Sequence, residues 1–225
     1  MEKNLKKYFP VFVLPTFVSF AVVFLIPFIL GIYLSFTEFT TVESAQWVGI
    51  ENYIKAFNED DNFLKALWFT VKFTIVSVIT INVFAFGLAL LLTKALKGTS
   101  IFRTIFFMPN LIGGIVLGYI WNLLINSILG IFGYDITYDA NYGFWGLVFL
   151  LNWQLIGYMM VIYIAGLQNI PQELNEAALI DGASSISILK NIKIPMVMPS
   201  VTICLFLTLT NSIYNQGQFR QLNLA

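Results

Sequence analysis

The chain has 225 residues, of which 58% are hydrophobic and 11% are charged, and its mean hydropathy is +0.81. Soluble domains carry about 25% charged residues, so this composition excludes an ordinary soluble protein and indicates an integral membrane protein. Basic and acidic residues balance at 12 each, and there is no histidine. The lack of histidine argues against His-based acid–base catalysis, and we predict no metal site.

Five apolar runs follow one another along the chain, and each is close to the roughly 20 residues that a membrane-spanning helix needs. The runs cover residues 9–36, 67–93, 104–126, 144–167 and 197–214. The first is about twice as long as the apolar core of a signal peptide, which favours a spanning helix there. We therefore predict an all-α fold, a polytopic membrane helical bundle with about five spans.

The basic residues between these runs predict the orientation of the spans, because Lys and Arg are enriched in cytoplasmic loops. They gather before the first span, between spans two and three, and between spans four and five: Lys3, Lys6, Lys7, Lys94, Lys97, Arg103, Lys190 and Lys193. The other two loops, 37–66 and 127–143, are mainly acidic. We expect a multi-pass protein of the cell (inner or plasma) membrane with a cytoplasmic N-terminus.

A polar stretch, "QELNEAALIDGASSISILKNIK", lies between spans four and five. Pro171 and Glu173 are typical of the start of a helix. Gly182 is typical of its end, and Ser184 or Ser185 can cap a second short helix. The residues alone leave two interpretations open, an ordinary capped loop or a knob that docks into a groove of a cytoplasmic partner.

Part of this stretch, "EAALIDGA", is followed by "IKIPMVMPS", and together they resemble the EAA motif of permease subunits of binding-protein-dependent ABC importers. The matching positions are Glu176, Ala177, Ala178, Asp181, Gly182, Ala183, Ile192 and Pro195. Three further stretches, "WVGIENYIKAF", "IFRTIFFMPNLIGGIVLGYIWNLL" and "YIAGLQNIPQELNEAALIDGAS", are similar to the sugar-type branch of that family, close to the maltose and multiple-sugar permeases. The resemblance runs from Leu14 to Pro199.

The resemblance implies one transmembrane permease domain over residues 1–225, with a cytoplasmic coupling (EAA) loop at 168–195. In the family this loop docks into ATP-binding subunits and transmits ATP-driven movement. The resemblance also implies a second permease subunit in a heterodimer, an extracytoplasmic solute-binding protein, and a carbohydrate or related polyol as substrate. The family core has one span more than this chain, so we expect a C-terminal truncation.

The chemistry missing from the sequence bears on the source of energy. No G-x-x-x-x-G-K-[ST] phosphate loop occurs, so we expect no enzyme activity and no cofactor in this chain, with ATP and Mg bound by the partner ATPase. The spans contain no Asp or Glu, which proton or sodium coupling usually requires. An importer permease is therefore favoured, with a secondary sugar carrier as the alternative. An intramembrane enzyme is disfavoured because histidine is missing and the spans lack Asp and Glu. We expect the chain to contact the lipid bilayer and no nucleic acid.

Polar and aromatic residues inside spans three and four are the candidates for contact with the substrate. They are Asn122, Asn126, Asn152, Trp153, Gln154 and Tyr158. Amides and aromatic faces suit a neutral, hydroxyl-rich ligand such as a sugar. The alternative is structural, because amides also bond between membrane helices and aromatic residues also form the interface belt.

Overall fold

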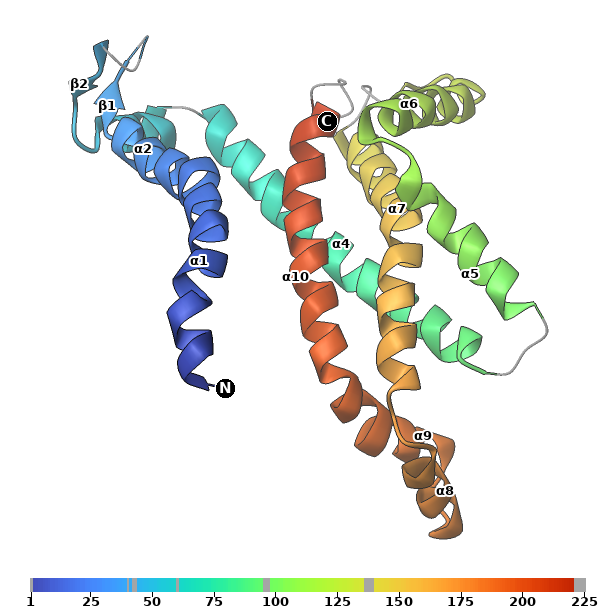
Figure 1. Cartoon of the computed structure of the whole chain (residues 1–225). Coiled ribbons are helices and arrows are strands. Elements are labelled where there is room, and N and C mark those ends of the chain that lie inside the picture. Colours follow the sequence, from blue (N-terminus) through green and yellow to red (C-terminus); the bar gives the residue numbers. More distant parts are fainter. Residues whose placement is uncertain are drawn as a thin grey trace. The chain divides into compact units, whose positions relative to one another are not determined.

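The computed structural model describes residues 2–39, 41, 44–59, 61–94, 98–135 and 140–220. These residues form two compact units, of which the first ends at Leu67 and the second begins at Trp68. Figure 1 labels the helices and strands of both units. Each unit is described by itself below.

The first unit begins with a long apolar helical segment and continues into a small hairpin and a short helix. Its elements are α1 (Glu2–Phe20), the π-helical turn η1 (Ala21–Leu25), α2 (Ile26–Ser35), β1 (Thr37–Glu38), β2 (Gln46–Trp47), α3 (Glu51–Ile54) and the π-helical turn η3 (Lys55–Glu59). Residues Val11–Ser35 are long and apolar enough to cross a membrane, in agreement with the predicted first span.

The π-helical turn inside this first span lies just before a proline. The N–H of Ile26 donates to the carbonyl of Ala21, five residues earlier, and Pro27 follows with no N–H of its own. A widened turn next to a proline is a common way for a helix to accommodate the missing donor. The span therefore continues through Pro27.

A two-stranded antiparallel hairpin follows α2, and the sequence analysis did not predict it. Thr37 pairs with Trp47, and the Trp47 ring stacks on that of Phe36 with 5.5 Å between the ring centroids. The side-chain amide of Asn52 donates to the carbonyl of Ser35 at 3.1 Å and to that of Thr37 at 2.9 Å. These bonds connect α3 to the end of α2.

The second unit is entirely helical in its described residues. Its elements are α4 (Asp61–Leu92, in this unit from Trp68 on), α5 (Thr99–Phe107), the 3₁₀ turn η4 (Met108–Leu111), α6 (Gly114–Gly130), α7 (Ala140–Gln168), α8 (Gln172–Ile180), α9 (Ser185–Ile188), the π-helical turn η5 (Leu189–Lys193) and α10 (Ile194–Arg220). In Figure 1, α7 and α10 run side by side, with α8 and α9 beyond one end of both.

Long apolar helices in this unit agree with the predicted second, fourth and fifth spans. They cover Asn62–Leu92, Asn141–Gln168 and Ser185–Tyr214. With the first span, the described residues hold four helices long and apolar enough to cross a membrane, and five spans if one bent pair is counted as a span. The chain is thus an all-α, polytopic membrane helical protein.

The bent pair is the predicted third span, and its shape differs from the prediction of one helix over 104–126. Residues Thr99–Leu111 and Val116–Gly130 form two helical pieces that meet at 100°. Pro109 tightens the chain into a 3₁₀ turn, and Gly113 then has extended backbone with φ −60° and ψ 137°. A proline and a flexible glycine four residues apart end one helix and start another.

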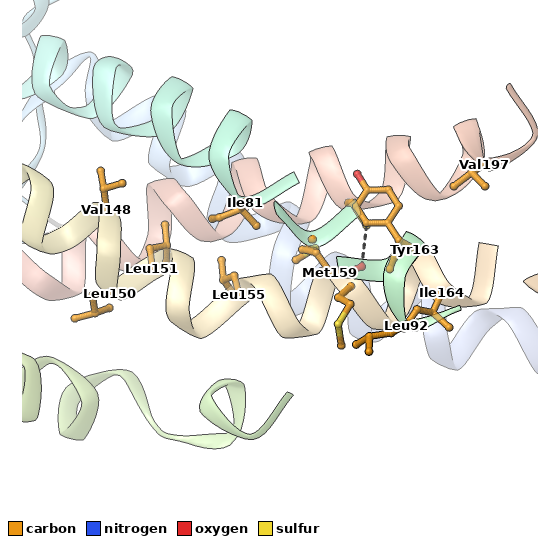
Figure 2. Packing of buried hydrophobic residues seen from close by; sticks show 14 of the residues in the cluster. Ile81, Leu92, Val148, Leu150, Leu151, Leu155, Met159, Tyr163, Ile164 and Val197 are labelled. Carbon is orange, nitrogen blue, oxygen red and sulfur yellow. Dashed lines mark hydrogen bonds between the residues drawn. The ribbon is translucent and has the colours of Figure 1, made fainter. Parts of the chain in front are cut away.

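The core of the second unit is built around α7. Figure 2 shows Leu151, Leu155, Met159 and Tyr163 of α7 in the same cluster as Ile81 of α4. All of these side chains are buried, with at most 2% of their surface exposed. Because protein interiors are close-packed, a shift of one helix would open cavities around these side chains. The cluster therefore determines how α4, α7 and α10 pack.

Two glycines permit close approach of helices to α7. A Cβ built at Gly157 would overlap the carbonyl group of Phe106 in α5. A Cβ built at Gly166 would overlap the hydroxyl of Ser200 in α10. Small residues at such contacts let helix backbones come together in membranes.

Candidate functional site

The loop between α7 and α10 contains the helix that the EAA motif predicts. Pro171 occupies the N-cap position of α8 with extended backbone, φ −56° and ψ 133°, and its carbonyl accepts from the N–H of Leu174 at 3.3 Å. Glu173 lies in the first turn, where the helix dipole favours a negative charge. The predicted helix start is therefore confirmed to within one residue.

The end of α8 is a Schellman turn centred on Gly182. The N–H of Ala183 donates to the carbonyl of Ala178 at 2.9 Å, and the N–H of Gly182 donates to that of Leu179 at 3.1 Å. Gly182 has φ +76°, a left-handed conformation that glycine adopts without steric cost. The predicted stop at Gly182 is confirmed, and the turn reverses the chain directly after the Glu-Ala-Ala residues.

The second helix of the loop begins at a serine cap. The Ser184 hydroxyl accepts from the N–H of Ser187 at 3.3 Å, so Ser184, rather than Ser185, provides the predicted cap. We refer to residues 172–188, which comprise α8, the turn and α9, as the EAA hairpin.

One expectation about this second helix was wrong, because it is not a separate short helix. From Ser185 to Tyr214 the chain is helical without a break. Within this run the N–H of Ile194 donates to the carbonyl of Leu189, five residues earlier, and Pro195 comes next. As at Pro27, a π-helical turn accommodates a proline that has no N–H to donate. The helix therefore continues through Pro195, and α9 is the first turn of the last span.

The structure divides the EAA positions between two places. Glu176, Ala177, Ala178, Asp181, Gly182 and Ala183 lie on the EAA hairpin, whereas Ile192 and Pro195 lie further along the helix that follows it. On the hairpin, Ala178 and Ala183 are half-buried and the other four are exposed. The exposed surface thus combines two small residues with two carboxylates at its edges.

Three large apolar side chains on the same hairpin were missed by the sequence analysis. Leu179 is 62% exposed, Ile180 86% and Ile186 66%. They flank the turn on both sides, although nothing in the described residues covers them. Leu179 and Ile180 directly precede "DG" in the sequence, and this position next to a turn could have indicated that they are exposed. The sequence analysis considered only the charged residues and the alanines of this stretch.

The predicted substrate contacts on α6 and α7 include two separate side-chain pairs. The Trp153 ring of α7 lies 5.7 Å from the Trp121 ring of α6, centroid to centroid, with 63° between the ring planes. Within α6, the side-chain amide of Asn126 donates to Oδ1 of Asn122 at 2.8 Å. Trp153 is 44% exposed, so part of the aromatic pair remains open.

The remaining three candidates also lie on α7. Asn152 and Gln154 are buried, and Asn152 donates to the carbonyl of Val148 at 2.8 Å. Oδ1 of Asn152 and Oε1 of Gln154 have no hydrogen-bond partner in the described part of the chain. Tyr158 packs edge-on against Phe107. The six candidates therefore do not form one cluster.

Comparison with known proteins relates the chain to transport systems. A family model described as the inner membrane component of binding-protein-dependent transport systems matches residues 97–215. The probable starch degradation products transport system permease protein AmyD of Thermoanaerobacterium thermosulfurigenes is 40% identical over 210 residues, covering 89% of this chain and 71% of that protein. The multiple sugar-binding transport system permease protein MsmF of Streptococcus mutans is 30% identical over 220 residues, covering 93% and 76%.

Solved structures agree on the fold. A chain of a bacterial ABC transporter involved in the import of the acidic polysaccharide alginate superposes with a TM-score of 0.75 at 21% identity. The match covers 94% of this chain and 76% of that one.

Proposed function

Because the chain belongs to the family of inner membrane components of binding-protein-dependent transport systems, we propose that it is the transmembrane permease subunit of an ABC-type importer for a carbohydrate or a related polyol. The observation that carries the proposal is the family match over residues 97–215, which includes the whole EAA hairpin.

Cytoplasmic ATP-binding subunits would dock on the EAA hairpin and supply the energy for transport. Exposed Leu179, Ile180 and Ile186 would supply the apolar centre of the contact. Ala177 lets a partner approach the helix backbone, and Glu176 adds a charge at the edge. ATP and Mg belong to those subunits, since this sequence has no phosphate loop.

The connection of the hairpin to the membrane supports a role in transmitting movement. The helix from Ser185 to Tyr214 is continuous, so a displacement of α9 carries α10 with it. On the other side, α8 is joined to α7 only through a short non-helical link that ends in Pro171. The hairpin would therefore drive α10 more directly than α7.

The substrate class rests on the relatives and on the side chains of α6 and α7. The names of relatives 40% and 30% identical refer to starch degradation products and to multiple sugars. In this chain, Trp121 and Trp153 form an aromatic pair between α6 and α7, and α6 also carries the amides of Asn122 and Asn126. Sugars bind through stacking of their C–H faces and hydrogen bonds to their hydroxyls, which this set provides.

Two further partners complete the proposal. A second permease subunit would form the other half of the pathway in a heterodimer, and an extracytoplasmic solute-binding protein would deliver the sugar. The N-terminus and the EAA hairpin would lie in the cytoplasm, because the basic residues of the connecting segments gather on that side.

Docking is tested with Ile180→Asp in the transporter assembled from all its subunits. The aspartate places a charge at the centre of the apolar contact, so we expect at least about a tenfold loss of ATPase binding. Ile131→Asp is the matched control, since Ile131 is 80% exposed and lies at the end of α6. Co-purification of the ATPase and ATP-driven sugar uptake are measured. Equal retention of the ATPase by both variants would overturn docking at the hairpin.

A further inference from the structure

A polar cavity lies where the ends of α4 and α7 meet the start of α8 and the turn η5. Its volume is about 350 Å³. Six polar residues among those described line it: Thr93, Lys94, Gln168, Gln172, Asn175 and Lys193. Four separate elements contribute to it, so its shape depends on the packed fold rather than on one loop.

The charge of this cavity is positive. Lys94 and Lys193 both line it, and none of the described residues that line it is acidic. Neither ammonium group forms an ion pair within the described ranges of the chain. The nearest carboxylates in sequence, Glu173 and Glu176, are exposed and follow Gln172 and Asn175 by one position, which turns them about 100° away around α8. The cavity is therefore suited to an anion.

The place of the cavity along the helices indicates the level of the membrane at which it lies. The spanning segments of α4 and α7 end at Leu92 and Gln168, so the cavity opens where apolar helix gives way to polar chain. Leu90, Leu167 and Ile170 form its apolar wall. Basic pockets between helices at this level bind the headgroups of anionic lipids.

From these observations we propose that the cavity binds the phosphate ester of an anionic lipid headgroup, with Lys94 and Lys193 on the phosphate. The headgroup of phosphatidylglycerol has this chemistry, and its acyl chains would lie along the apolar wall. Free glycerol phosphate has the same groups without the chains. The cavity is lined by Gln172 and Asn175 of the EAA hairpin but not by Leu179, Ile180 or Ile186, and it does not depend on the transported substrate.

The test uses the full chain in nanodiscs of phosphatidylcholine with increasing phosphatidylglycerol, and native mass spectrometry counts the retained lipids. We expect Lys94→Gln and Lys193→Gln each to weaken retention of phosphatidylglycerol about fivefold. Lys190→Gln is the matched control, because Lys190 lies in the same turn as Lys193 but outside the cavity. Thermal melting of each variant verifies that the fold is kept.

A second arm separates the two sources of the phosphate ester. If free glycerol phosphate displaces the retained lipid, and the lysine variants abolish the displacement, the cavity takes the soluble ester as well. If it does not displace the lipid, the headgroup is the occupant. The proposal is overturned if the wild-type chain retains the two lipids equally and free glycerol phosphate does not bind, or if Lys190→Gln weakens retention as much as Lys193→Gln.

Discussion

The hydroxyl of Tyr163 in α7 donates a 2.7 Å hydrogen bond to Oδ1 of Asn82 in α4. The amide nitrogen of Asn82 donates in turn to the hydroxyl of Thr208 in α10 at 3.0 Å. All three side chains are buried, with at most 9% of their surface exposed. One asparagine thus joins three spans, in surroundings where water does not compete for its bonds.

Removing the hydroxyl with Tyr163→Phe should destabilise the protein by about 0.6–1.7 kcal/mol, the range of hydrogen bonds between membrane helices. The physical reason is that Oδ1 of Asn82 loses its donor while the ring packing is kept. Tyr119→Phe is the control, since Tyr119 is 63% exposed. Denaturant unfolding in mild detergent gives both values, and equal stability of the two variants would contradict a structural role for the bond.

Gly157→Ala should prevent α5 from packing against α7. The added methyl group would overlap the carbonyl of Phe106, and because backbone cannot rotate away, α5 must move. Overpacking of this kind costs about 1–3 kcal/mol. Gly87→Ala in α4 is the control, because no atom lies within 4 Å of its Cβ position. A lower melting temperature is expected for the first variant alone.

Gly182→Ala should weaken the turn of the EAA hairpin by about 1–2 kcal/mol, the cost of a left-handed conformation for a residue with a Cβ. Space is not the cause, since nothing lies within 4 Å of the added methyl group. Gly182→Asn should lose less, because asparagine tolerates this conformation, and Gly182→Pro should lose most. The hydrogen-exchange rate of the Ala183 amide measures the stability of the turn. The amount of co-purified ATPase measures docking. The reverse order of the alanine and asparagine variants would show that φ is not what matters.

Trp153→Leu and Trp121→Leu should each reduce sugar uptake by the assembled transporter about fivefold, because each removes one face of the aromatic pair. The double variant should lose less than the product of the two single losses, since the two rings contact each other. Trp145→Leu, also on α7 and 52% exposed, is the control. Uptake that is unchanged in Trp153→Leu would argue for a purely structural role of the pair.

The elements that local chemistry determines were predictable from the sequence. Apolar length alone located the spans that contain α4, α7 and α10, although the helix of the last span begins twelve residues earlier than predicted. Pro171, Gly182 and Ser184 marked the ends of the helices in the loop. Each helix end depends on one residue and its immediate neighbours, and the known preferences of residues for caps and turns predict such ends.

Contacts between distant residues could not be predicted in this way. Asn82 and Tyr163 are 81 positions apart, and nothing near either residue indicates the other. Gly157 looks like any glycine in a membrane helix until α5 is placed against it. The break in the third span was also missed, because average hydropathy does not register what Pro109 and Gly113 do to the backbone.

The unbroken helix from Ser185 to Tyr214 is long enough that a small tilt at one end displaces the other end considerably. Its 30 residues span about 45 Å at 1.5 Å per residue. A tilt of about 10° imposed on α9 would sweep the opposite end of such a rod through about 8 Å, more than one helical pitch of about 5.4 Å. In the proposed transporter, a modest rotation at the EAA hairpin would therefore be magnified at the other end of this helix.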